Sequence, residues 1–217
     1  SIYAAGYPVD AAAVLLVELD GQPEAVAAEH AIVQRILMAH GARSVRGATE
    51  PAERARLWQG RTKAFGAMGR IAPDLAVQDA VVPRYTLPDI LDRIDAIRRQ
   101  YALPISNVFH AGDGNLHPNI SFDRRDPALA ARVHAASRDI MAACVAVGGS
   151  ITGEHGVGSD KIDYMPLIFD AETLGAMQAV RRVFDPAERA NPGKVVPVRA
   201  CREWACSPAG RGEVVAS

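Results

Sequence analysis

The segment 108–119 constrains the fold more than any other part of this chain. At its centre, Asp113-Gly114 lies between two stretches typical of extended backbone. Asp-Gly in that position is the strongest short-range signal for a β-hairpin, because a type I′ turn requires positive φ at both turn residues. With these two residues as the loop, position 110 pairs with position 117. Directly opposed residues share one face with Cβ atoms roughly 5 Å apart, so the sequence predicts that His110 and His117 face each other.

A glycine-rich loop further along the chain contributes two more reactive side chains. Five of the eleven residues in 148–158 are glycine, and Glu154-His155 lies among them. Two imidazoles and one carboxylate leave an open coordination position, which suits catalytic Zn²⁺, and Mn²⁺ or Fe²⁺ nearly as well. We therefore expect His110, His117 and Glu154 to bind a divalent metal. His155 is then free to act as general base, because an imidazole titrates close to neutral pH.

Simpler interpretations of these two motifs stay open on spacing alone. The histidines could be a hydrogen-bonded pair that shapes a pocket, and the loop could be a flexible linker with two solvated polar residues. Asn119 is expected on the same strand face as His117, where it could bind a ligand oxygen or only shape the strand beside Pro118. Arg61 and Arg84 are candidate carboxylate clamps, although single arginines are more often surface residues.

The order of apolar patterns along the chain indicates an α+β fold. Strands and helices alternate at first, then two strands pair directly, and the last third is mostly helical. The predicted strands are 13–19 and 77–82, with short extended segments at 42–47 and after 191–194. The predicted helices are 23–40, 49–68, 88–101, 127–147, 161–169 and 171–184.

Composition excludes several classes of function. The formal net charge is −1 with both signs interspersed, so nothing suggests a nucleic-acid or membrane-surface partner. The longest apolar runs, 11–17 and 140–147, are far shorter than the ~20 residues of a membrane span. No secretory signal is visible, which favours the cytoplasm, and three cysteines argue against a disulfide framework. The start at Ser1 suggests a piece of a longer protein.

Three motifs together resemble the C-terminal half of FAD-linked 2-hydroxyacid oxidases and dehydrogenases. This is the group of the glycolate oxidases and D-lactate dehydrogenases within the vanillyl-alcohol-oxidase superfamily. The motifs are HAGDGNLH from His110 to His117, GSITGEHGVG from Gly149 to Gly158, and NPGK from Asn191 to Lys194. The similarity extends over most of the chain.

The resemblance implies a reaction and a role for each matching residue. Such enzymes oxidise a small D-2-hydroxy acid to the 2-keto acid by hydride transfer to FAD, with a divalent metal, Zn²⁺ or Mn²⁺, orienting the substrate where it is present. Phe65 and Val77 occupy places where the D-2-hydroxyglutarate members carry threonine and lysine, which implies a smaller substrate such as glycolate or D-lactate. By position, the metal ligands are His110, His117 and Glu154, the base is His155, the substrate contacts are Arg61 and Asn119, and the cofactor-side residues are Asn191 and Lys194.

The resemblance also implies how the chain is organised. We expect a substrate-binding domain over 1–150, with a ferredoxin-like antiparallel or mixed sheet covered by helices, and a helical segment over 151–199 that packs on an FAD domain. An irregular tail over 200–217 completes the chain. FAD would be held mainly by an N-terminal domain that this sequence lacks, so the fragment alone is expected to be inactive. Partner subunits or a homodimer are expected. The alternatives are a metal-dependent hydrolase or lyase with the same His/His/Glu site, and a non-catalytic subunit-interaction domain.

Overall fold

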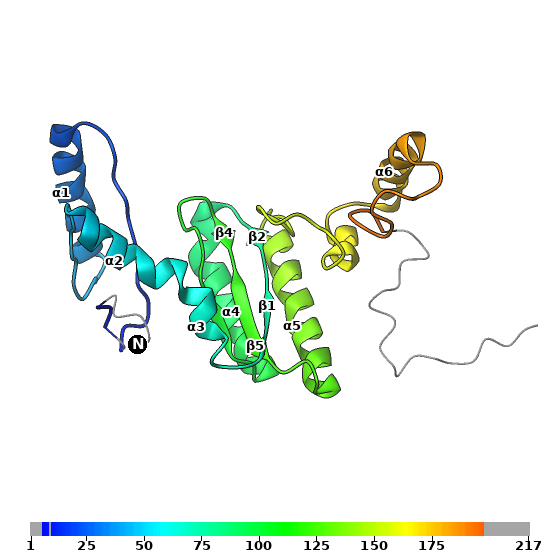
Figure 1. Ribbon diagram of the computed structural model, residues 1–217, viewed down its shortest axis with the longest axis horizontal. Coiled ribbons are helices and arrows are strands. Elements are labelled where there is room, and N and C mark those ends of the chain that lie inside the picture. The colour runs from blue at the N-terminus through cyan, green and yellow to red at the C-terminus, as the bar shows by residue number, and fades with distance from the viewer. Residues whose placement is uncertain (1–5, 9, 198–217) are drawn as a thin grey trace, which may run out of the picture. The chain divides into compact units, whose positions relative to one another are not determined.

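The computed structural model describes residues 6–8 and 10–197 (Figure 1). The chain divides into two compact units, Ser1–Arg70 (the first unit) and Ile71–Ser217 (the second unit). The predicted tail 200–217, with Cys201 and Cys206, lies outside the described residues. The functional division at residue 150 that the sequence suggested stays a prediction.

The regular structure described in the first unit is helical. It consists of α1 (Pro23–Ala39), α2 (Pro51–Thr62) and α3 (Ala64–Met68). Both longer helices begin at a proline, whose missing N–H costs nothing in the first turn. The helix predicted over 23–40 is confirmed. The one predicted over 49–68 is interrupted at Lys63, where φ is −100° and ψ is 6°, so it becomes two helices.

The strand predicted over 13–19 is wrong for this structure, because these residues form no strand. Their apolar side chains stay exposed: Val14 is 49%, Leu15 58% and Val17 49% accessible. A strand requires a neighbouring backbone to pair its N–H and C=O groups, and an apolar pattern does not say where that neighbour is. The extended segment predicted over 42–47 likewise forms no strand.

The second unit contains small antiparallel sheets flanked by two long helices. Strands β1 (Asp74–Val77), β5 (Pro118–Phe122) and β3 (Ile105–Asn107) pair in the order β1-β5-β3, and β2 (Ala80–Val81) pairs with β4 (Asn115–Leu116). The β2–β4 register continues that of β1–β5. The two ladders are therefore one sheet in register, interrupted at residues 78–79 on one strand and at residue 117 on the other.

The connections of these strands give a ferredoxin-like order. Helix α4 (Leu87–Tyr101), preceded by the 3₁₀ turn η1 (Arg84–Thr86), links the first strand pair to β3, and α5 (Pro127–Ala146) follows β5. After α5 the chain returns to the sheet, where Ser150 bridges Val81. The resulting β-α-β-β-α-β sequence confirms the predicted α+β class, with its last strand reduced to a single bridge.

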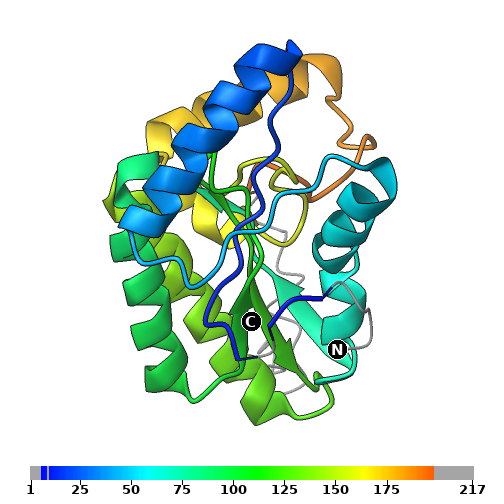
Figure 2. The same cartoon turned by 90° about the vertical axis from the view of Figure 1, so that its left-hand side faces the viewer.

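The core lies between the sheet and the two helices, which both views place on the same side of the strands (Figures 1 and 2). Helix α4 buries Ile90, Ile94 and Ile97 at helical spacing. Strand residues Leu116 and Ile120 are fully buried against this layer. The buried residues of α5 are Val133, Ala136, Ser137, Ile140, Met141 and Cys144.

The part of the second unit after α5 is mostly loop, with one further α-helix. Helix α6 (Ala171–Phe184) matches its prediction, whereas 161–169 forms the 3₁₀ helix η2 (Ile162–Leu167), which contains Pro166. The short strand predicted after 191–194 does not form within the described residues, which end at Pro197. Among the described helices, none has the length and apolar character to cross a membrane. The cytoplasmic location suggested by the sequence stays a prediction.

Candidate active site

The histidine hairpin forms, but its register differs from the prediction by two residues. His110 bridges Asn115, and Asn107 pairs with Pro118, so the loop is 111–114 rather than 113–114. Asp113 lacks the positive φ that a type I′ turn needs. Gly114 has φ 72° and packs so closely on the neighbouring strand that a Cβ there would lie 2.2 Å from the Val82 carbonyl oxygen. That contact selects a longer loop.

A slip of two residues keeps each side chain on its own face, so the two histidines still meet, but diagonally. The His110 and His117 ring centroids lie 5.6 Å apart and the rings are nearly perpendicular. His117 is almost fully buried, with 3% of its side chain exposed, whereas the side chain of His110 is 45% exposed. The pair therefore has a buried member and a solvent-facing member.

Glu154 lies at the centre of the histidines. Its Oε1 lies 3.0 Å from His117 Nε2, 3.6 Å from His155 Nε2 and 3.9 Å from His110 Nε2. The rings of His117 and His155 are stacked, with centroids 5.0 Å apart and 13° between their planes. Glu154 and His155 are half-exposed, so the cluster opens toward solvent on one side. We call His110, His117, Glu154 and His155 the histidine cluster.

His117 is oriented by the interrupted strand opposite it. Its Nδ1 lies 3.2 Å from the Gln78 carbonyl oxygen. Because a carbonyl can only accept, Nδ1 is the donor in this contact, and Nε2 is the nitrogen that faces Glu154. Nε2 is therefore the ring nitrogen placed to act as a ligand.

Asp79 is the residue that sequence reasoning missed. In the continued register it lies directly opposite His117, with its Oδ1 4.0 Å from His117 Nδ1, and its side chain is fully buried. Burial alone raises the pKa of this carboxyl, but hydrogen bonds from Lys161, the His155 backbone and Thr152 outweigh that effect and hold the pKa well below its usual range. Its only trace in the sequence is one acid, after Gln78, in the stretch predicted as a strand over 77–82.

Lys161 accompanies Asp79 into the interior. Its Nζ lies 2.9 Å from Asp79 Oδ2 and donates to the Asp79 carbonyl oxygen at the same distance. Burial lowers the pKa of the Lys161 ammonium, and Asp79 partly restores it. The two opposite charges offset each other in the low-dielectric interior.

The donor set and its spacing fit a divalent metal. Ligand atoms around a tetrahedral ion with bonds of about 2.0–2.1 Å lie about 3.4 Å apart. The distances from Glu154 Oε1 to the His117 and His110 nitrogens bracket that value. The group of possible ligand atoms that all lie within 4.8 Å of one another consists of Asp79, His117, Glu154 and His155. It contains the predicted base, His155, but not the predicted ligand His110. The arrangement combines imidazole and carboxylate donors with an open side, as catalytic metal sites do.

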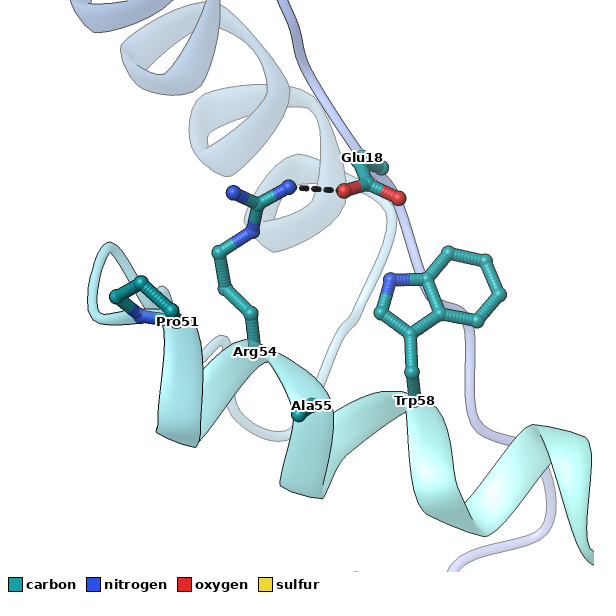
Figure 3. A pocket seen from close by; sticks show the side chains of 5 residues that line it. All are labelled: Glu18, Pro51, Arg54, Ala55 and Trp58. Atoms are coloured by element: carbon teal, nitrogen blue, oxygen red, sulfur yellow. Dashed lines mark hydrogen bonds and ion pairs between the residues drawn. The ribbon is translucent and has the colours of Figure 1, made fainter.

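A separate shallow pocket lies within the first unit. It has a volume of about 470 Å³ and is lined by one face of α2 together with Glu18 (Figure 3). Arg54 and Glu18 form an ion pair across it, beside the Trp58 indole. None of the site residues predicted from the sequence lines this pocket, although Arg61 follows one turn later in α2.

Comparison with known proteins identifies the family. The model of "FAD linked oxidases, C-terminal domain" matches residues 2–195. The chain belongs to this family. It is 47% identical over 201 residues to the glycolate oxidase subunit GlcD of Escherichia coli, covering 92% of this chain and 40% of that protein.

Two other relatives extend the comparison. The glycolate oxidase subunit GlcD of Bacillus subtilis is 37% identical over 190 residues, which are 88% of this chain and 40% of that protein. A mitochondrial D-lactate dehydrogenase [cytochrome] of Arabidopsis thaliana is 30% identical over 172 residues, 78% of this chain and 30% of that protein. This FAD-linked oxidase domain thus spans less than half the length of the curated relatives it matches.

The other predicted site residues of the FAD-linked oxidase domain lie in both units. Asn119 is fully buried in β5: its Nδ2 donates to the His117 carbonyl oxygen at 2.6 Å, and its Oδ1 has no hydrogen-bond partner. Arg61 belongs to α2, with its guanidinium 6.0 Å from the Phe65 ring centroid. Arg84 is exposed, and its Nη1 lies 3.5 Å from the Gly112 carbonyl oxygen in the hairpin loop.

Asn191 and Lys194 lie in the loop after α6. Arg181 of α6 donates to the carbonyl oxygens of both residues, at 2.9 and 3.2 Å. Val195, next along the chain, donates to the Gly158 carbonyl oxygen at 2.8 Å. This loop is therefore tied through its backbone to the end of the glycine-rich loop that carries Glu154 and His155.

Proposed function

We propose that the protein carrying this chain oxidises a small D-2-hydroxy acid, glycolate or D-lactate, to the 2-keto acid, with FAD as hydride acceptor. The observation that carries the proposal is that His117 Nε2 and His155 Nε2 lie 3.0 and 3.6 Å from Glu154 Oε1, in a chain that belongs to the FAD-linked oxidases. The names of its relatives support the substrate class.

In this proposal the histidine cluster has two tasks. His110, His117 and Glu154 bind a divalent ion, Zn²⁺ or Mn²⁺, which when bound supplies positive charge that lowers the pKa of the substrate hydroxyl. His155 takes the hydroxyl proton at its Nε2 while the hydrogen on C2 leaves as hydride. His155 Nε2 lies 3.6 Å from Glu154 Oε1, between the 3.0 Å of His117 Nε2 and the 3.9 Å of His110 Nε2, so the proposed base stands directly beside the proposed ligands.

Substrate binding is assigned to Arg61 and Asn119. A guanidinium binds a carboxylate through two parallel hydrogen bonds, which gives Arg61 its role. The unpartnered, buried Oδ1 of Asn119 supports a role as acceptor for a donor that the substrate supplies, because such an atom is costly to leave unsatisfied. The apolar Phe65 and Val77 favour a small substrate over a dicarboxylate.

The remaining proposals concern the cofactor and partners. We assign Asn191 and Lys194 to the cofactor side, in keeping with their loop's tie to the glycine-rich loop. Because two relatives are named as subunits of glycolate oxidase, we also propose that the protein assembles with partner subunits, with a homodimer as the alternative.

The test is anaerobic reduction of the flavin in the full-length protein. Glycolate or D-lactate should bleach the flavin absorbance in a single turnover, and D-2-hydroxyglutarate should do so far more slowly. The proposal fails if the protein purifies without flavin, or if the flavin is present and neither small acid reduces it. Turnover that persists after the flavin is removed would instead support the metal-dependent hydrolase or lyase.

A further inference from the structure

Asp79 is surrounded by donors from one short segment of the glycine-rich loop. Its two carboxylate oxygens accept from the Thr152 hydroxyl at 2.8 Å and from three successive backbone N–H groups, with Lys161 Nζ as a further donor at 2.9 Å. The three backbone donors are those of Gly153 at 3.1 Å, Glu154 at 3.2 and 3.3 Å, and His155 at 3.0 Å.

These contacts make Asp79 an anchor of the loop rather than a metal ligand. Five donors converge on Oδ2 of this carboxylate, and one of them, the Glu154 N–H, also reaches Oδ1 at 3.2 Å. His117 turns Nδ1 toward Asp79 and Nε2 toward Glu154, so the ligand side of that ring faces away from Asp79. Although Asp79 belongs to the compact group of possible ligands, its Oδ2 is engaged by the loop and by Lys161, and its Oδ1 lies on the Nδ1 side of His117.

The loop closes upon itself around this anchor. Gly156 N–H donates to the Thr152 hydroxyl oxygen at 2.8 Å, while that hydroxyl donates to Asp79. Gly153 lies so near the Asn115 amide that a Cβ there would be 2.6 Å from its Oδ1, so the backbone passes where a side chain could not. Consecutive N–H groups converging on one anion form a nest, which fixes backbone direction residue by residue.

We propose that Asp79 is the positioning residue of the histidine cluster: its buried carboxylate shapes the 152–155 backbone so that Glu154 and His155 project toward His117. Asp79 thereby connects the interruption of the sheet, where it lies opposite His117, to the glycine-rich loop. The Lys161 ammonium offsets the negative charge of its carboxylate. The consequence for metal and proton binding rests on the proposed function, whereas the shaping of the loop does not.

The first experiment uses Asp79→Asn in the full-length, flavin-containing protein. An asparagine keeps the shape but has one acceptor oxygen, and its amide group opposes the backbone N–H donors. Hydrogen exchange of the 153–155 amides should accelerate about tenfold or more, because hydrogen bonds to a charged acceptor are lost. The Mn²⁺ affinity should fall about 10–100-fold, as expected for loss of a group that orients ligands. Asp123→Asn, at an exposed carboxylate bound to Arg125, is the matched control and should change neither quantity.

A second variant separates positioning from folding. Asp79→Asn leaves the Lys161 charge buried without its counterion, which destabilises the fold, whereas Asp79→Asn/Lys161→Met removes both charges together. The double variant should recover thermal stability while the loop amides still exchange fast and Mn²⁺ still binds weakly. The proposal is overturned if the double variant regains wild-type exchange and affinity, or if Asp79→Asn behaves like the Asp123→Asn control. Faster loop exchange in a protein whose wild type binds no Mn²⁺ would support the positioning role and contradict the metal site.

Discussion

The two units of this chain use similar amphipathic helices with opposite results. In the second unit, α4 and α5 bury isoleucine, valine and methionine side chains against the sheet. In the first unit, α1 and α2 have no buried residue, and Ile32, Ile36 and Met38 of α1 remain about half exposed. Helical periodicity therefore predicts a helix in both units, but packing only where a sheet is present to cover it.

The candidate functional residues also differ between the two units. In the second unit, His117 and Asp79 lie at the interruption of the packed sheet and are buried, and Asp79 holds the loop that carries Glu154 and His155. The first unit contributes Arg61 on α2, a helix that also carries surface ion pairs such as Arg56–Glu53, which stabilise little. The comparison predicts that chemistry and stability concentrate in the second unit.

The largest effect should come from the proposed base. His155→Asn removes the proton acceptor and should lower the rate of flavin reduction about 10²–10⁴-fold, with the flavin spectrum unchanged. The matched control is His40→Asn, at the end of α1 in the first unit, which should react at the wild-type rate. Stopped-flow absorbance at the flavin band measures the rate of flavin reduction in both variants. Equal rates would contradict the conclusion that the chemistry is concentrated in the second unit.

The next effect concerns the two helical surfaces. Ile140→Ala in α5 removes a fully buried side chain and should cost about 2–5 kcal/mol of local stability. Ile36→Ala in α1, at a side chain 50% exposed, should cost less than about 1 kcal/mol. Hydrogen exchange of the α5 and α1 amides in the full-length protein reports each value. A cost for Ile36→Ala as large as that for Ile140→Ala would show that α1 is covered.

A smaller, pH-dependent effect comes from the buried thiol of α5. Burial raises the pKa of Cys144 to about 12 from an ordinary value of 9.0. Between those values the unfolded chain loses the thiol proton and the folded unit keeps it, so stability falls as pH rises, by about 1 kcal/mol per pH unit. Below pH 9 the group has no effect. The free energy of unfolding in urea, measured at pH 8, 9 and 10, should lose this pH dependence in Cys144→Ala. An unchanged pH dependence in the variant would mean that the thiol of the folded protein titrates as it does in water.

The smallest effect is at the helix starts. Asp126 accepts from the Ala128 and Leu129 N–H groups at the start of α5, at 2.9 and 3.0 Å, so Asp126→Ala should destabilise α5 by about 1 kcal/mol. Gln22, before α1, makes no capping hydrogen bond, and Gln22→Ala should change stability by less than about 0.5 kcal/mol. Exchange of the first-turn amides distinguishes them. Similar values for both would mean that the first unit depends on its caps as much as the second.

The sequence predicted what local chemistry determines. Helix limits followed from proline, capping residues and apolar spacing, and the α+β class from the order of the patterns. The strand over 13–19 failed because pairing depends on a partner that local sequence does not reveal. The hairpin loop failed because the close approach of Gly114 to Val82 is a tertiary constraint. The prediction that His110 and His117 share one face of the hairpin was still correct, because strand side chains alternate with a period of two and the register error was two residues.

Asp79 could not be predicted because its role is made by distant residues. The residues that bind it, Thr152, Glu154, His155 and Lys161, follow it by more than seventy positions. A single acid between two short strands carries no motif. Glu154 and His155, by contrast, lie in a segment whose five glycines in eleven residues can be recognised from the sequence alone. Predictions for Arg61, Asn119, Asn191 and Lys194 stay predictions, since each requires a bound substrate or cofactor to be tested.

The most direct test of the central claim is a Mn²⁺ titration of the purified, flavin-containing protein, followed by electron paramagnetic resonance of the free ion. The histidine cluster predicts one bound ion per chain in the wild type and in His40→Asn, with affinity at least about 100-fold weaker in Glu154→Gln and His117→Ala, because each removes a ligand. Equal affinity in all four proteins, or no bound Mn²⁺ in the wild type, would contradict it.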